Sequence, residues 1–200
     1  MKVKNILTLF IVCFTITVNA QTFKAGAIVG LNASQIRGDA SAGFNKLGVV
    51  GGLRGVVILK DKMEASLELL YSQRGSFQQT TINNSDEIRI NTDYIEIPVI
   101  FNYLDWQGED YFRLHFHAGL SYGRLINATI QNEKIDPILE DFSENDFSWL
   151  AGFTYYVNKH VGLTARYTRS INFLFDRSKS SINSPSYLGF FLTFQAVYMF

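Results

Sequence analysis

Two histidines on one predicted strand are the first candidates for chemistry in this sequence. His115 and His117 stand two residues apart in YFRLHFHAGLSYG, so both side chains would lie on the same face of a strand. Such a pair binds a metal ion when carboxylates complete the site. The candidate carboxylates are Glu64, Glu68 and Glu96. The alternative, which we favour, is a polar network with Arg113 inside the protein.

A nucleophile beside a base is the other chemistry to consider, and His117 with Ser121 is the local candidate. Residues four apart on a strand are separated by roughly 13 Å, which is too far for direct proton transfer. We therefore expect no catalytic site, no metal and no cofactor. The single cysteine, Cys13, lies in the apolar N-terminal run, so a thiolate site is not expected in the exported protein.

The element that carries both histidines alternates with a period of two, as a strand does. Its apolar face runs from Phe112 to Tyr122, and the other face is polar or small. The same alternation recurs along the chain and predicts about eight strands: 23–35, 45–59, 63–75, 90–104, 111–126, 147–157, 161–174 and 187–200. Short and long connectors alternate between them. We predict an all-β fold, an eight-stranded antiparallel up-and-down transmembrane β-barrel.

The two faces of these strands indicate a barrel in a membrane rather than a soluble one. One face is large and aromatic, with tyrosines near the strand ends, as at bilayer interfaces. The other face is small and polar and suits a narrow interior with paired charges. The predicted polar network of the lumen comprises Arg54, Glu64, Glu68, Glu96, Arg113, His115, His117 and Arg166. In a membrane the first and last strands must pair, because an open edge would leave backbone groups unbonded.

The N-terminal segment 1–20 has the features of a cleaved signal peptide, and 21–200 would be the barrel domain. A basic start, MKVKN, precedes the apolar run ILTLFIVCFTITV and the small-residue ending VNA. Lys+Arg and Asp+Glu number 18 each, so no basic surplus exists to bind nucleic acid. Only 18% of the residues are charged, below the average for soluble domains.

Four segments are informative in combination: ELLYSQRG (68–75), DYIEIPVIFNY (93–103), FHAGLSYGRLI (116–126) and ARYTRSI (165–171). Together they resemble the PorT-like outer-membrane β-barrel family of Gram-negative bacteria. The resemblance implies location in the outer membrane, contact with its lipid and insertion by the barrel-assembly machinery. In that setting the terminal strand, with Tyr198 and Phe200, resembles the signal that this machinery reads. The family supplies no catalytic motif.

The function expected from this sequence is that of a non-enzymatic scaffold linked to secretion or to the cell envelope. Its lumen would be filled by side chains, because eight strands enclose little more than their own side chains. The loops 76–89 and 127–146 would contact a protein partner at the cell surface. Two alternatives remain open: a small channel, and a lipid-modifying enzyme of the outer membrane.

Overall fold

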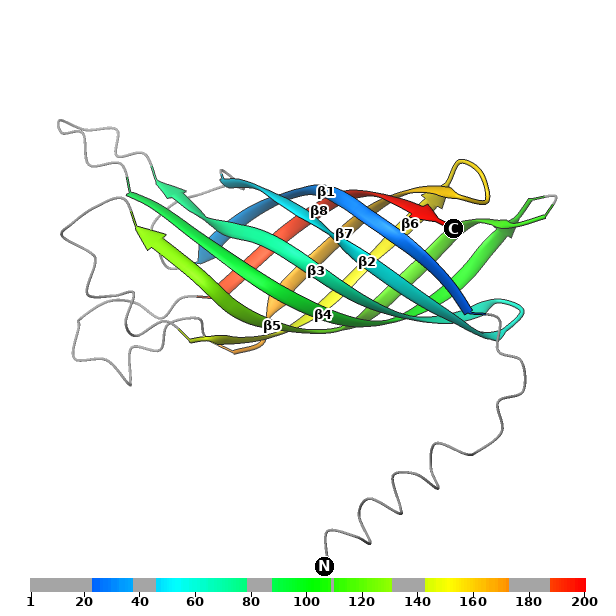
Figure 1. Cartoon of the computed structure of the whole chain (residues 1–200), viewed down its shortest axis with the longest axis horizontal. Helices are drawn as coiled ribbons and strands as arrows, with labels where there is room; N and C mark the ends of the chain where they lie inside the picture. The colour runs from blue at the N-terminus through cyan, green and yellow to red at the C-terminus, as the bar shows by residue number, and fades with distance from the viewer. Residues whose placement is uncertain (1–22, 38–45, 79–87, 109, 131–142, 173–187) are drawn as a thin grey trace, which may run out of the picture.

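The chain folds into a closed barrel of eight antiparallel strands, seen from the side in the computed structural model of Figure 1. The structure describes residues 23–37, 46–78, 88–108, 110–130, 143–172 and 188–200. The strands are β1 (Phe23–Arg37), β2 (Lys46–Lys60), β3 (Met63–Gln78), β4 (Ile88–Gln107), β5 (Phe112–Ile130), β6 (Asn145–Tyr156), β7 (Val161–Ser170) and β8 (Leu188–Met199). Both the predicted fold class and the predicted number of strands are confirmed.

Each strand pairs with its neighbours in the sequence, and β8 closes the ring against β1. The closing register pairs Gly26 with Met199 and Arg37 with Leu188, so no strand edge is left open. Short connections join β2 to β3, β4 to β5 and β6 to β7, all at one end of the barrel, which we call the turn side. The opposite end is the loop side. Segment 1–20, the predicted signal peptide, lies outside the described residues.

The outer face of the barrel carries an apolar belt with polar borders. On β4 the outward residues from Ile95 to Tyr103 are apolar or aromatic. Asp93 precedes this run on the loop side and Asp105 follows it on the turn side. Nine residues on a tilted strand match the hydrocarbon thickness of a bilayer. The belt therefore gives this sheet the exterior of a membrane barrel, with its polar face turned inward.

The strand ends differ from the predicted bounds in ways that have local causes. The predicted seventh strand continued to residue 174, but β7 ends at Ser170. Beyond it the ladder closes with Ile171 N–H donating to Phe147 O at 2.7 Å. The side chain of Asn172 then accepts a hydrogen bond from Phe147 N–H, in place of a backbone carbonyl. β3, β4 and β5 instead extend further toward the loop side than the alternation indicated.

Glycine allows the closest approach between strands inside the barrel. A Cβ added at Gly152 on β6 would lie 2.3 Å from Ala165 O and 2.8 Å from the Cα of Arg166 on β7. It would also lie 2.8 Å from His117 Nε2 on β5. Only glycine fits at this position. Because it has no side chain, it leaves room for His117 and Arg166 in the lumen.

Candidate functional site

Four buried side chains form a cluster at the centre of the lumen, which we call the central cluster. Arg166 on β7 donates two hydrogen bonds to Glu68 on β3, at 2.8 and 3.0 Å. Arg54 Nε on β2 lies 3.2 Å from the same carboxylate. Arg166 Nε donates to His117 Nε2 on β5 at 3.4 Å, so the imidazole accepts and stays neutral. Two guanidinium groups therefore share one carboxylate, and the cluster carries a net positive charge.

A second cluster, the loop-side cluster, surrounds Arg74 on β3. Arg74 Nη1 donates to Asp146 Oδ2 at 2.6 Å, and Arg74 Nε donates to Glu96 Oε1 at 2.9 Å. The guanidinium lies over the rings of Tyr94, at 4.7 Å, and Phe191, at 4.1 Å. Here one cation faces two carboxylates, so this cluster carries a net negative charge. The two clusters thus balance each other inside a low-dielectric interior.

Little space remains in the lumen between the two clusters or beside the loop-side cluster. A cavity of about 10 Å³ touches both Arg166 and Glu96, and another of about 10 Å³ touches Arg74 and Tyr94. Each has room for about one water molecule. Asn32 fills further space by donating to Ser72 Oγ at 2.8 Å while accepting from Thr193 Oγ1 at 2.8 Å. In the part of the chain that the structure describes, side chains close the lumen.

The turn side is more open. A cavity of about 480 Å³ extends from Arg54 to the short turns. On its wall, Glu64 Oε1 lies 3.4 Å from Lys24 Nζ, and Glu64 Oε2 lies 3.8 Å from His115 Nδ1. Asn102 beside them donates to Ser66 Oγ at 2.5 Å. The charged groups here are therefore more loosely paired than those of the two clusters.

The structure divides the predicted polar network into separate groups. Arg54, Glu68, His117 and Arg166 meet in the central cluster, Glu96 belongs to the loop-side cluster, and Glu64 with His115 lines the turn-side cavity. Arg113 is half-buried at the turn-side end of β5 and forms no ion pair with another described residue. Its expected place in the network is therefore not observed.

Sequence reasoning missed Arg74 and Asp146, which complete the loop-side cluster. Arg74 continues the alternation that begins at Glu64, so the same count would have placed it on the inner face of its strand. Asp146 falls within the predicted loop 127–146. It lies at the start of β6 and shares a face with Ser148, whose hydroxyl donates to Asp146 Oδ2 at 3.1 Å.

The geometry does not assemble either kind of reactive site that the sequence raised. Among the described residues, no three His, Cys, Asp or Glu side chains lie close enough together to hold a metal ion. His117 Nδ1 and Ser121 Oγ are both buried, and neither has a hydrogen-bond partner. The serine is therefore not activated by the histidine.

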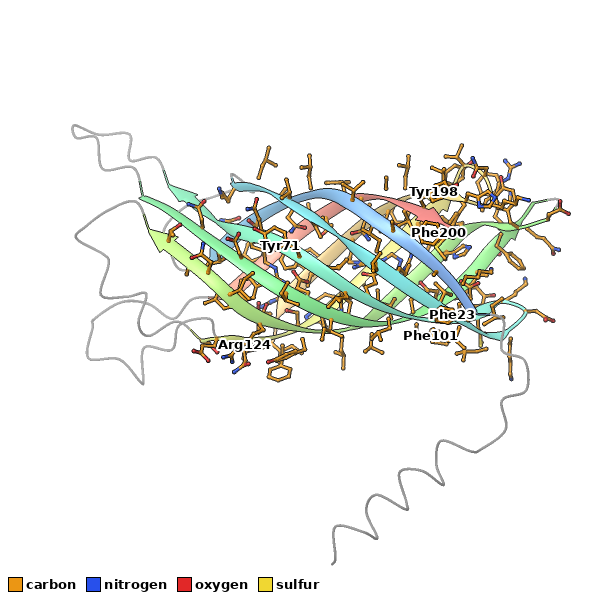
Figure 2. All side chains as sticks on the ribbon, in the orientation of Figure 1. Phe23, Tyr71, Phe101, Arg124, Tyr198 and Phe200 are labelled. Atoms are coloured by element: carbon orange, nitrogen blue, oxygen red, sulfur yellow. The ribbon has the colours of Figure 1, made fainter. Side chains whose placement is uncertain are left out.

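The end of the last strand places Tyr198 and Phe200 on the outer face near the turn side (Figure 2). Tyr198 is 52% exposed, Phe200 is 71% exposed, and their rings lie 5.9 Å apart. Phe200 N–H donates to Ala25 O at 2.9 Å, which extends the seam between β8 and β1 by one bond. Phe23 lies at the same end, whereas Arg124 lies near the loop side.

This fold, with an apolar exterior and a closed polar lumen, defines an integral membrane β-barrel. The chain belongs to the family described as the outer membrane protein beta-barrel domain, whose model matches residues 19–176. Membership of this family places the protein in the outer membrane of a Gram-negative bacterium. No curated protein matches the chain.

Solved structures of small outer-membrane barrels are similar to this chain in fold. The neisserial surface protein A is 12% identical, with a TM-score of 0.53 over 89% of this chain and 97% of that chain. The attachment invasion locus protein Ail of Yersinia pestis, in complex with the heparin analogue sucrose octasulfate, is 12% identical with a TM-score of 0.48. That match covers 89% of this chain and 99% of Ail. OprG of Pseudomonas aeruginosa is 12% identical, with a TM-score of 0.43 over 89% of this chain and 94% of OprG.

Proposed function

We propose that this protein is a non-conducting, non-enzymatic barrel that anchors surface loops in the outer membrane. The observation that carries this proposal is the filled lumen. The central cluster and the loop-side cluster follow one another along the barrel, and the cavities beside them have volumes of about 10 Å³ each. A hydrated ion with its water shell does not fit such spaces.

The barrel would then serve as a rigid support for the loops 76–89 and 127–146, which would contact a protein partner at the cell surface. Both loops lie largely outside the described residues, and the proposal for them rests on their sequences. Apolar side chains stand among the charges of 127–146, for example Ile138, Leu139 and Phe142. Exposed apolar side chains in a loop favour a protein partner.

The segments that resemble the PorT-like family support a finer assignment within the outer-membrane barrels. On this reading the protein takes part in secretion or in another envelope function, and the barrel-assembly machinery inserts it with Tyr198 and Phe200 as assembly residues. The structure contributes the position of both rings on the outer face of the closing strand. Barrels that carry Tyr198→Ala and Phe200→Ala together should accumulate less in the outer membrane than the wild type at equal synthesis.

Two experiments test the proposed function. In planar bilayers the purified barrel should give no steady conductance steps, and ohmic steps of constant size would favour the channel. Crosslinking and pull-down from native outer membranes should recover a partner that is lost when residues 131–142 are deleted. Deletion of residues 38–45, another loop-side connector, is the control and should leave the recovered partner unchanged. Equal recovery from all three proteins would remove loop 127–146 from the proposal.

A further inference from the structure

The turn-side cavity has the size and position of a ligand site. Short turns of outer-membrane barrels face the periplasm, so the cavity opens to that compartment. Its volume of about 480 Å³ lies in the range of small-molecule sites. The buried side chain of Arg54, held against Glu68, closes its inner end. A ligand would therefore enter and leave on the periplasmic side without crossing the membrane.

Two hydrogen-bond acceptors face each other on the wall of this cavity. His115 Nε2 lies 3.2 Å from the carbonyl oxygen of Phe112, which only accepts, so Nε2 carries the proton. Nδ1 is then unprotonated and accepts, as does Glu64 Oε2 beside it. These two atoms lie 3.8 Å apart, beyond hydrogen-bond distance. A group with at least two donor hydrogens, placed between them, would satisfy both.

The charge of Glu64 favours a cationic donor at this point. Glu64 is buried, and its other oxygen lies 3.4 Å from the ammonium group of Lys24, a long contact for an ion pair. The remaining oxygen is therefore open to a second ammonium group. A divalent metal ion fits less well, because no third His, Cys, Asp or Glu side chain of the described residues completes a site.

The rest of the cavity suits a ligand with an apolar body and an anionic end. Val56, Leu104, Tyr156 and Met199 form an apolar lining. Lys60, the last residue of β2, and Lys159, on the turn between β6 and β7, line the mouth. Asp61 and Asp110, which also line it, are acceptors for amide N–H groups. An ammonium group, an apolar body, amide donors and a carboxylate together describe a peptide.

We propose that the turn-side cavity binds a short periplasmic peptide with free termini. Its terminal ammonium group lies between Glu64 and His115, its apolar side chains lie against Val56 and Leu104, and its carboxylate faces Lys60 and Lys159. The probe can be as short as three residues, which span about 10 Å when extended. This site is independent of the loops, so it stands or falls separately from the proposed scaffold function.

Calorimetric titration of the full barrel in detergent micelles tests the site with Ala-Leu-Ala as the probe. The peptide with free termini should bind. The N-acetylated peptide should bind at least about tenfold more weakly, because it lacks the charge-assisted hydrogen bonds of an ammonium group. The C-amidated peptide should also bind more weakly to the wild type than the free peptide does. Its affinity for the double variant Lys60→Gln/Lys159→Gln should equal its affinity for the wild type.

The variant Glu64→Gln should weaken binding of the free peptide by about tenfold. Glu144→Gln is the matched control, because Glu144 is an exposed carboxylate on the loop side that pairs with Arg124. Binding by this control should equal that of the wild type. A gel shift between unheated and boiled samples establishes that each variant is folded. The His115 ring resonances of the wild type should shift on titration, which reports the site directly.

Three results would overturn the proposal: no binding of the free peptide to the wild type, equal binding of the N-acetylated peptide, or equal loss in Glu64→Gln and Glu144→Gln. The comparison of peptides needs only the wild-type protein, so it decides the matter even if Glu64→Gln fails to fold. The two tests of the proposed function are separate from this one. Neither the loss of a loop-dependent partner nor the presence of conductance would support or contradict peptide binding.

Discussion

Arg166 on β7 and Glu68 on β3 are joined across the lumen by hydrogen bonds of 2.8 and 3.0 Å. These strands are four apart in a ring of eight, so the ion pair joins opposite walls of the barrel. Arg54 from β2 approaches the same carboxylate at 3.2 Å. Glu68 therefore balances the charge of two buried guanidinium groups, whereas each arginine is only one of the two partners of Glu68. This asymmetry makes the three residues unequal in their effect on stability.

Removal of Glu68 should be far more damaging than removal of Arg54. Glu68→Ala leaves both guanidinium groups buried without a carboxylate, and we expect a loss of about 3–5 kcal/mol in the free energy of unfolding. Arg54→Met keeps the Arg166–Glu68 pair and replaces a cation by an apolar chain of similar length, so the loss should be smaller. Urea unfolding in lipid vesicles, followed by the fluorescence of Trp106 and Trp149, measures both.

The control for this comparison is an ion pair outside the lumen. Arg124 and Glu144 lie 2.6 Å apart at the loop side, and both side chains are exposed. Glu144→Gln should cost less than about 1 kcal/mol, because water and salt screen the pair. Equal losses for Glu68→Ala and Arg54→Met would contradict the asymmetric sharing of the Glu68 carboxylate.

The two clusters should close the lumen independently. Glu68→Ala/Arg166→Ala removes the connection across the centre but leaves Arg74 in place between Glu96 and Asp146, with Tyr94 and Phe191 against it. We expect no conductance from this double variant in planar bilayers. Addition of Arg74→Ala should produce conductance steps, because the second cluster is then lost as well. Steps from the double variant alone would show that the loop-side cluster does not seal the barrel.

Close strand packing at Gly152 gives a test of the barrel interior. Gly152→Ala would place a methyl group 2.3 Å from Ala165 O, a contact with backbone that no side-chain motion relieves. The folded fraction, read from the gel shift between unheated and boiled samples, should fall strongly. Gly51→Ala on β2 is the control, since the nearest atom to its added methyl group is Ile28 O at 3.4 Å. A normal yield of Gly152→Ala would mean that β6 and β7 separate more easily than this packing indicates.

Alternation along the chain predicts the strands and their inner faces well, because side chains of neighbouring strand residues must point to opposite sides. It assigned Glu68, Glu96 and Arg166 to the lumen, where they are buried. Membrane closure likewise required the pairing of β1 with β8, which the structure contains. These features follow from local geometry and from the absence of water in the bilayer.

The partners within the lumen depend on register and barrel shear, which the sequence does not reveal. His115 and His117 share a face, yet one lies beside Glu64 and the other beside Arg166. Glu68 and Arg166 are 98 residues apart, and only the closed ring brings them together. The pairing of Arg74 with Asp146 across 72 residues has the same origin. Side-chain polarity therefore identified the lumen, whereas topology determined its two clusters.

The apolar belt makes a final prediction about charge on the outer face. Leu120 on β5 is 63% exposed on the outer surface, opposite Val99 on β4, in the middle of the belt. Leu120→Arg places a cation in hydrocarbon and should lower the free energy of unfolding in vesicles by about 2–4 kcal/mol. Asn91→Arg, beyond the polar border on β4, should change it by less than about 1 kcal/mol, because its guanidinium group reaches the headgroups. Similar effects of both substitutions would mean that the hydrocarbon layer does not coincide with the belt from Ile95 to Tyr103.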